Sequence, residues 1–100
     1  MSRDDTRRTL ICYDIPNDNR RTHVAKILGK YGDRIQYSVF VVDISPAQLI
    51  RLKMEANKII DRVEDSLLFC DLGVLANLDD KRFSYLGQPR DITPSDIIVI

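Results

Sequence analysis

The chain has 100 residues, of which 15 are Lys or Arg and 15 are Asp or Glu, so its net charge is zero. This length predicts one domain spanning residues 1–100. The zero net charge argues against a protein coated in positive charge for nucleic acid, although residues 1–34 hold eight basic and five acidic side chains. No apolar run is long enough to cross a membrane, and no signal-peptide pattern follows Met1, so we expect a cytoplasmic protein.

The first third of the chain predicts a strand followed by a helix. Residues 8–15 form an apolar run with little alternation, which is typical of a strand covered on both faces. Asn17 or Asp18 is suited to cap the next helix, and Gly32 is placed to end it in a left-handed conformation. The apolar face of this helix is expected to comprise Val24, Ile27, Leu28 and Tyr31.

The middle of the chain predicts an extended segment and a second helix. Residues 34–44 are rich in β-branched and aromatic side chains and lack a Gly-containing turn, so the pattern alone predicts one long strand. Ser45, Pro46 and Gln48 form a capping box with proline at the first helical position. The apolar face that follows is expected to comprise Leu49, Leu52, Ala56, Ile59, Ile60 and Val63.

The last third predicts strands at residues 65–73, 83–86 and 97–100. The chain is therefore α+β, and if residues 34–44 fold back on themselves the order becomes βαββαβ, the ferredoxin-like arrangement. Two helices cover only one face of such a sheet, whereas the strands look apolar on both. The simplest cover for the other face is a second copy of the chain, which predicts a sheet-to-sheet homodimer. Cys12 and Cys70 lie in apolar runs and are expected to be buried and reduced.

Asp14 is the most informative polar residue, because it ends the first apolar run. A carboxylate in that position costs desolvation energy unless it meets a metal, a cation or a backbone donor. One carboxylate is a poor Mg²⁺ site, but two copies of Asp14 across a dimer axis could hold one ion. The alternative is that Asp14 caps the turn that follows it.

Four segments together resemble the Cas two family, the small CRISPR-associated endonuclease of bacteria and archaea. They are Tyr13-Asp14-Ile15, Asn19-Arg20-Arg21, residues 31–40 (YGDRIQYSVF) and residues 64–67 (EDSL). The resemblance covers nearly the whole chain. It implies a ferredoxin-like fold, a break near Ser38-Val39, and a symmetric homodimer with facing sheets. It also implies an extra C-terminal strand, residues 90–100, that pairs with the partner subunit.

The resemblance further implies metal-dependent cleavage of RNA or double-stranded DNA, with Mg²⁺ or Mn²⁺, and a role beside the Cas integrase in spacer acquisition during antiviral defence. Asp14 matches the family's catalytic, metal-binding aspartate. The expected nucleic-acid-binding residues are Arg20, Arg21, Arg34, Ser38 and Phe40. Two alternatives remain open, a non-catalytic DNA-bridging scaffold for the integrase and a toxin-like RNA-cleaving relative.

Each of these residues also has a plain structural interpretation. The arginines suit solvated positions, Ser38 suits bonding to its strand neighbours, and Phe40 suits the hydrophobic core, where most phenylalanines lie.

Overall fold

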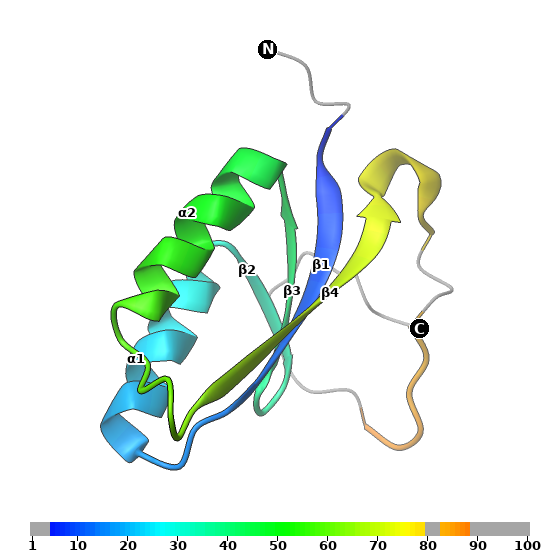
Figure 1. Ribbon diagram of the computed structural model, residues 1–100. Helices are drawn as coiled ribbons and strands as arrows, with labels where there is room; N and C mark the ends of the chain where they lie inside the picture. Colours follow the sequence, from blue (N-terminus) through cyan, green and yellow to red (C-terminus); the bar gives the residue numbers. More distant parts are fainter. Residues whose placement is uncertain (1–4, 80–82, 89–100) are drawn as a thin grey trace.

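The computed structural model describes residues 5–79 and 83–88 as an α+β domain (Figure 1). The four strands form one sheet in the order β2-β3-β1-β4, and all neighbouring strands are antiparallel. Both helices cover the same face of this sheet. The elements in chain order are β1 (Arg7–Asp14), α1 (Asp18–Gly29), β2 (Gly32–Gln36), β3 (Val39–Ile44), α2 (Pro46–Asn57), β4 (Ser66–Val74) and a 3-10 turn, η1 (Leu75–Asn77).

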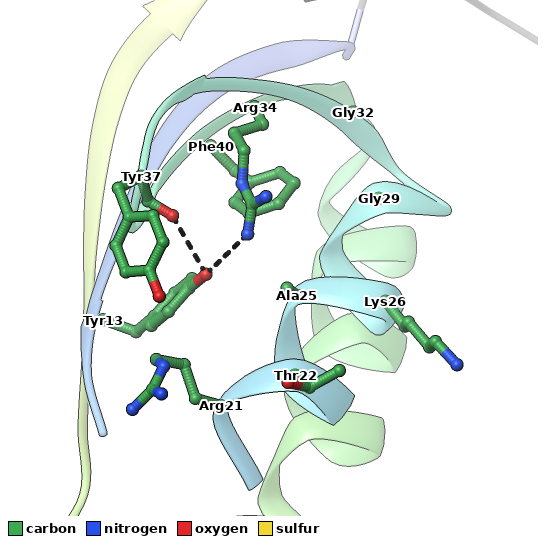
Figure 2. Close-up of a pocket in the computed structure, with 10 residues that line it drawn as sticks. All are labelled: Tyr13, Arg21, Thr22, Ala25, Lys26, Gly29, Gly32, Arg34, Tyr37 and Phe40. Carbon is green, nitrogen blue, oxygen red and sulfur yellow. Dashed lines mark hydrogen bonds between the residues drawn. The ribbon is translucent and has the colours of Figure 1, made fainter. Parts of the chain in front are cut away.

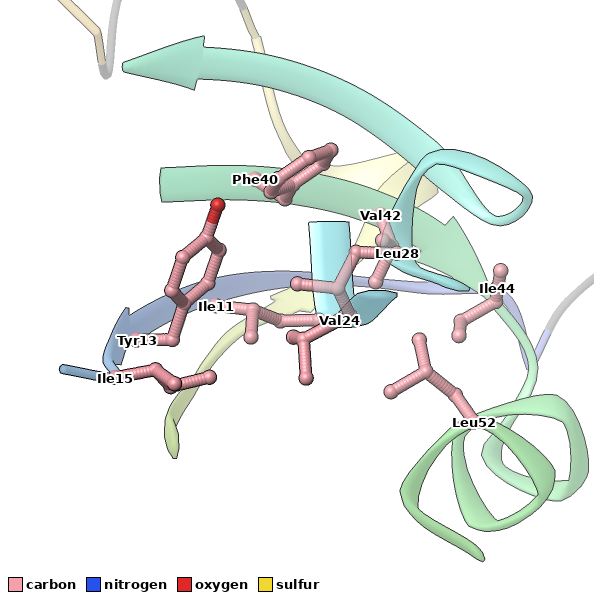
Figure 3. Close-up of a cluster of buried hydrophobic side chains, with 9 residues drawn as sticks. All are labelled: Ile11, Tyr13, Ile15, Val24, Leu28, Phe40, Val42, Ile44 and Leu52. Carbon is pink, nitrogen blue, oxygen red and sulfur yellow. The ribbon is translucent and has the colours of Figure 1, made fainter. Parts of the chain in front are cut away.

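The main core lies between the sheet and the two helices (Figure 3). Ile11 and Tyr13 point into it from β1, because side chains two residues apart share one face of a strand. Val24 and Leu28 of α1 meet them at helical spacing, and Leu52 enters from α2 with no exposed surface. Burying these apolar side chains is the dominant favourable term that holds the helices on the sheet.

Both helix starts are as predicted. The side chain of Asn17 accepts a hydrogen bond from the backbone of Arg20 at 2.9 Å, which caps α1. Ser45 caps α2, and Gln48 returns its side chain to the backbone N–H of Ser45 at 2.9 Å. These caps satisfy backbone N–H groups that the first turn of a helix leaves unpaired.

The predicted long strand at residues 34–44 is wrong when taken from the residue pattern alone, because Tyr37 and Ser38 form a turn between β2 and β3. The break that the family resemblance implied near Ser38-Val39 is therefore confirmed. The pairing of β2 with β3 is irregular between Arg34 and Gln36, so a turn without glycine is combined with a local shift in register.

The predicted role of Gly32 is also wrong. Helix α1 ends at Gly29, and Gly32 is the first residue of β2 with no left-handed backbone. A side chain is excluded there for another reason, since a Cβ at Gly32 would lie 2.2 Å from the carbonyl oxygen of Val41. The second predicted apolar face is too long, because α2 ends at Asn57 and Val63 is exposed.

The outer face of the sheet, opposite the helices, carries a small second cluster. Ile35 and Val41 are buried there, and Phe83 and Tyr85 pack against them. Residues 83–86 are therefore an irregular segment over the sheet rather than the predicted strand. Farther along the same face, Cys70 is exposed, which contradicts its predicted burial, while Cys12 is partly buried.

Two predictions concern residues that the structure does not describe. The final strand at residues 97–100 and the pairing of residues 90–100 with a partner both lie outside the described ranges. Within those ranges, neither α1 nor α2 has the length and apolar character of a membrane span.

Candidate nucleic-acid and metal site

Asp14 lies exposed at the end of β1, opposite Ser66 of β4. Because Tyr13 points into the helix-side core, strand alternation places Asp14 on the outer face with Cys12. Within residues 5–79 and 83–88, no side chain or backbone group forms a hydrogen bond or ion pair with its carboxylate. The carboxylate accepts no hydrogen bond from the described residues of the turn that follows β1, so the alternative in which Asp14 caps that turn is wrong.

The described part of one chain does not fit a magnesium site. It contains no group of three or more His, Cys, Asp or Glu side chains that could hold a metal ion. Mg²⁺ demands near-octahedral oxygen coordination, and one Asp14 supplies one carboxylate. A metal bound at Asp14 would therefore need donors from a second copy of the chain or from a ligand.

A separate groove of about 550 Å³ lies on the helix side of the sheet, between α1 and the β2–β3 hairpin (Figure 2). Arginine, lysine and aromatic side chains line it, and none of the described residues that line it is a carboxylate. The basic and aromatic members are Arg21, Lys26, Arg34, Tyr13, Tyr37 and Phe40. Such a lining favours an anionic ligand that also carries a flat ring.

Arg34 is held at the centre of this groove by aromatic residues. Its Nη2 donates to the hydroxyl of Tyr13 at 3.2 Å, and that hydroxyl donates to the carbonyl of Tyr37 at 3.3 Å (Figure 2). Its guanidinium carbon lies 5.3 Å from the ring centre of Phe40 and 5.8 Å from that of Tyr37, within cation–π range. The aromatic rings of Phe40 and Tyr37 thus hold the guanidinium of Arg34 in place, with no carboxylate among the described residues that line the groove.

Phe40 belongs to the hydrophobic core and is 3% exposed, beneath the guanidinium of Arg34. Tyr37, by contrast, is 69% exposed. A base that stacks in the groove would therefore meet Tyr37 or Arg34 rather than Phe40. Phe40 therefore supports the guanidinium of Arg34 from below.

Arg21 lines the groove and holds the loop between β1 and α1 in place (Figure 2). One Nη donates to the carbonyl of Ile15 at 2.9 Å, and the other forms an ion pair with Asp18. The hydrogen bond that Arg21 donates to the carboxylate of Asp18 raises the pKa of Arg21 above its usual value. Asp18 offsets part of the charge of Arg21, so the positive character of the groove depends mainly on Arg34 and Lys26.

Arg20 points elsewhere and forms a clamp with the segment before β4. It donates to the two carboxylate oxygens of Asp65 at 2.6 and 3.0 Å, and to Glu64 at 3.2 Å. The Asp65 side chain has 0% exposure and also accepts from the backbone of Asp61. The Arg20 hydrogen bonds hold the pKa of Asp65 below its usual value, with the backbone N–H of Asp61 adding to the effect.

We expect Asp65→Asn to reduce the thermal stability at pH 7, because it removes the charge that pairs with Arg20. The pKa of Asp65 is lower in the folded protein than in the unfolded chain, where it is about 3.9. The ionised carboxylate therefore stabilises the fold at pH values above about 3.9, and this stabilisation is lost as the pH falls through the folded pKa. The Tm difference between wild type and variant should therefore narrow below about pH 4. Thermal unfolding monitored by circular dichroism from pH 3 to 7 measures this Tm difference. A Tm difference that does not depend on pH would contradict the stabilising ion pair between Arg20 and Asp65.

Ser38 lies in the β2–β3 turn and does not line the groove. Its carbonyl accepts from the backbone N–H of Tyr13 at 3.1 Å, which joins the turn to β1. The structure thus brings Arg21, Arg34 and Phe40 together, while Asp14 lies on the opposite face of the sheet.

Four polar or aromatic residues of the groove, Tyr13, Thr22, Lys26 and Tyr37, were not predicted as site residues from the sequence. Thr22 and Lys26 are four residues apart, which places them on one side of α1, and this spacing is visible in the sequence. Nothing in the sequence indicates that this side of α1 faces the β2–β3 hairpin.

The family model for CRISPR associated protein Cas2 matches residues 7–75. A Synechocystis protein named CRISPR-associated endoribonuclease Cas2 3 is 44% identical over 93 residues, 91% of this chain and 96% of the relative. The crystal structure of Streptococcus pyogenes Cas2 at pH 6.5 is 35% identical and covers 80% of this chain and 99% of its own, with a TM-score of 0.71.

A chain in a partial Cas6-RT-Cas1–Cas2 complex is 33% identical and covers 66% of this chain and 78% of its own, with a TM-score of 0.60. The family model, the curated relative and the solved structures agree with one another and with the resemblance in the sequence. The chain therefore belongs to the CRISPR associated protein Cas2 family.

Proposed function

We propose that this protein is a dimeric, metal-dependent endonuclease of RNA or double-stranded DNA that uses Asp14 and takes part in spacer acquisition. The observation that carries the proposal is the exposed Asp14 carboxylate, which is left without a partner in the described residues. A carboxylate placed at a strand end and not used by the fold is available for a metal ion. The endoribonuclease name of the Synechocystis relative supports the same activity.

The metal site is proposed to form between two chains. The strand order β2-β3-β1-β4 suits the ferredoxin-like topology, in which two such sheets can face one another. Leu68 and Cys70 are exposed on the outer face that carries Asp14, so a second sheet would bury them. Two Asp14 carboxylates at the twofold axis, with water, would hold one Mg²⁺ or Mn²⁺. The bound ion would polarise a phosphoryl oxygen and lower the pKa of a bound water.

The remaining predicted residues take distinct parts in this proposal. Arg34 and Arg21 contact the nucleic acid, because a guanidinium donates charge-assisted hydrogen bonds to anionic groups. Phe40 supports Arg34 by holding its guanidinium in place. Arg20 and Ser38 act as positioning residues, since Arg20 pairs with two carboxylates and Ser38 bonds to β1 through its backbone.

A second candidate function is a DNA-bridging scaffold for the Cas integrase. The likeness to a chain solved in a Cas1–Cas2 complex and the family assignment both favour this scaffold function. The family assignment also makes a toxin-like RNA-cleaving relative a weaker alternative than the scaffold. A scaffold would bind DNA and the integrase without needing Asp14. The two functions are compatible in one protein.

Cleavage by the wild-type protein tests the enzyme. Labelled single-stranded RNA and duplex DNA are incubated with Mg²⁺, with Mn²⁺ or with chelator, and products are separated on a denaturing gel. We expect products only when metal is present. If neither substrate is cleaved under any condition, the scaffold replaces the enzyme as the function, and cleavage that persists in chelator would contradict metal dependence.

A further inference from the structure

We propose that the groove between α1 and β2 binds one unpaired nucleotide of a single strand, with the backbone crossing α1 at Thr22 and Lys26. This inference rests on the proposed function for the class of ligand. It specifies the ligand of the groove that Arg21 and Arg34 line, on the face of the sheet opposite Asp14, and adds three residues, Thr22, Lys26 and Tyr37, to the contacts with nucleic acid.

The volume and lining of the groove fit one nucleotide. About 550 Å³ lies within the usual range of ligand pockets, which begins near 300 Å³. Tyr37 offers an exposed ring at one end, with the guanidinium of Arg34 5.8 Å from its centre. Bases stack on aromatic rings and on arginine planes, and a base reaches such a surface only when it is not paired within a duplex.

The groove continues across the solvent side of α1. Thr22 and Lys26 line both the main groove and a second depression of about 310 Å³, which Asn19 and His23 complete. Figure 2 shows Lys26 projecting from α1 away from the aromatic end of the groove. No ion pair holds the ammonium group of Lys26 within the described residues, so its charge is available to a phosphate.

The groove and the second depression together form a continuous binding surface for a single strand of nucleic acid. The base occupies the end with Tyr37 and Arg34, the phosphate passes the hydroxyl of Thr22, and Lys26 meets the phosphate from the solvent side. Asp14 lies across the sheet, so a nucleotide in the groove of one chain is not the nucleotide at the Asp14 carboxylate of that chain. The groove therefore serves to hold the strand.

Binding without cleavage tests this site. Fluorescence anisotropy in chelator measures the affinity of the 100-residue protein for a labelled 12-nucleotide single strand of DNA, the same sequence in RNA, and a blunt DNA duplex. We expect Tyr37→Ala to weaken single-strand binding about 5- to 150-fold and Tyr37→Phe to retain it, because stacking on one aromatic ring contributes about 1–3 kcal/mol. Duplex binding should change by less than single-strand binding. The DNA and RNA arms establish whether the groove distinguishes the sugar.

Lys26→Ala tests the phosphate contact, and Lys58→Ala at the end of α2 is its charge-matched control. The slope of log affinity against log salt should fall by about 0.7 in Lys26→Ala and stay constant in Lys58→Ala. If Tyr37→Ala and Lys26→Ala fold and bind single strands as wild type does, the groove is not a nucleotide site. Metal-dependent cleavage by wild type would still support the proposed function in that case, so the two proposals fail separately.

Discussion

Asp14→Asn is expected to lower the metal-dependent cleavage rate at least about 100-fold, while the Tm stays within about a degree of wild type. Asparagine keeps the shape of the side chain but removes the charge that attracts a divalent cation. Mutation of residues that only orient a metal ligand typically lowers metal affinity or activity about 10- to 100-fold, so loss of a direct ligand should lower it by at least the upper end of that range. Stability should persist because no described group forms a hydrogen bond or ion pair with the Asp14 carboxylate.

Asp5→Asn is the matched control, since Asp5 is an exposed carboxylate just before the other end of β1. Both variants lose one negative charge, but only Asp14→Asn should lose cleavage on gels run with Mg²⁺. A large fall in Tm for Asp14→Asn would indicate a structural carboxylate. Equal cleavage by both variants and wild type would mean that Asp14 is not catalytic.

Gly32→Ala is expected to destabilise the fold by about 1–3 kcal/mol or more, the usual cost of forcing extra atoms into a packed site. The new Cβ would lie 2.2 Å from the Val41 carbonyl oxygen and 2.7 Å from Cγ1 of Val42. The nearest of these atoms belongs to backbone, so the strand pairing of Gly32 with Val42 must shift. Thermal unfolding should show a Tm lower by about 4–8 °C for each kcal/mol.

Gly29→Ala provides the comparison, because it adds the same methyl group three residues earlier. No atom of the described residues lies within 4 Å of a Cβ at Gly29, and this residue is the last of α1. Alanine is the better helix former, by about 1 kcal/mol in a helix interior, so Gly29→Ala should be neutral or mildly stabilising. If the two variants unfold at the same temperature, the close approach of β2 and β3 at Gly32 is not as described.

The features that could be predicted from the sequence are those that depend on residues close together along the chain. The capping box of Ser45 and Gln48 spans three positions, so its residue types specify its geometry, and the structure confirms it. The β2–β3 hairpin could not be found from the residue pattern, because its turn, Tyr37-Ser38, lacks the Gly, Asn or Asp that signals a two-residue hairpin turn. Gly32 was misinterpreted as a helix terminator because its actual constraint comes from Val41 on the adjacent strand.

The candidate site shows the same division. Asp14 was identified because an apolar run that ends in a carboxylate is a local feature. The partner of Arg20 was not, because Asp65 lies 45 residues farther along the chain. The groove combines β1, α1 and the β2–β3 hairpin, so its shape exists only after the sheet has formed. The placement of Asp14 and Arg34 on opposite faces likewise follows from strand alternation and register.

The proposed metal site predicts a stoichiometry that one measurement can check. Calorimetric titration with Mn²⁺, at a concentration where sedimentation shows the dimer, counts the ions bound per chain. Two Asp14 carboxylates that share one ion predict half an ion per chain in wild type and none in Asp14→Asn. One ion per chain, or binding that survives in Asp14→Asn, would contradict a metal held between two copies of Asp14.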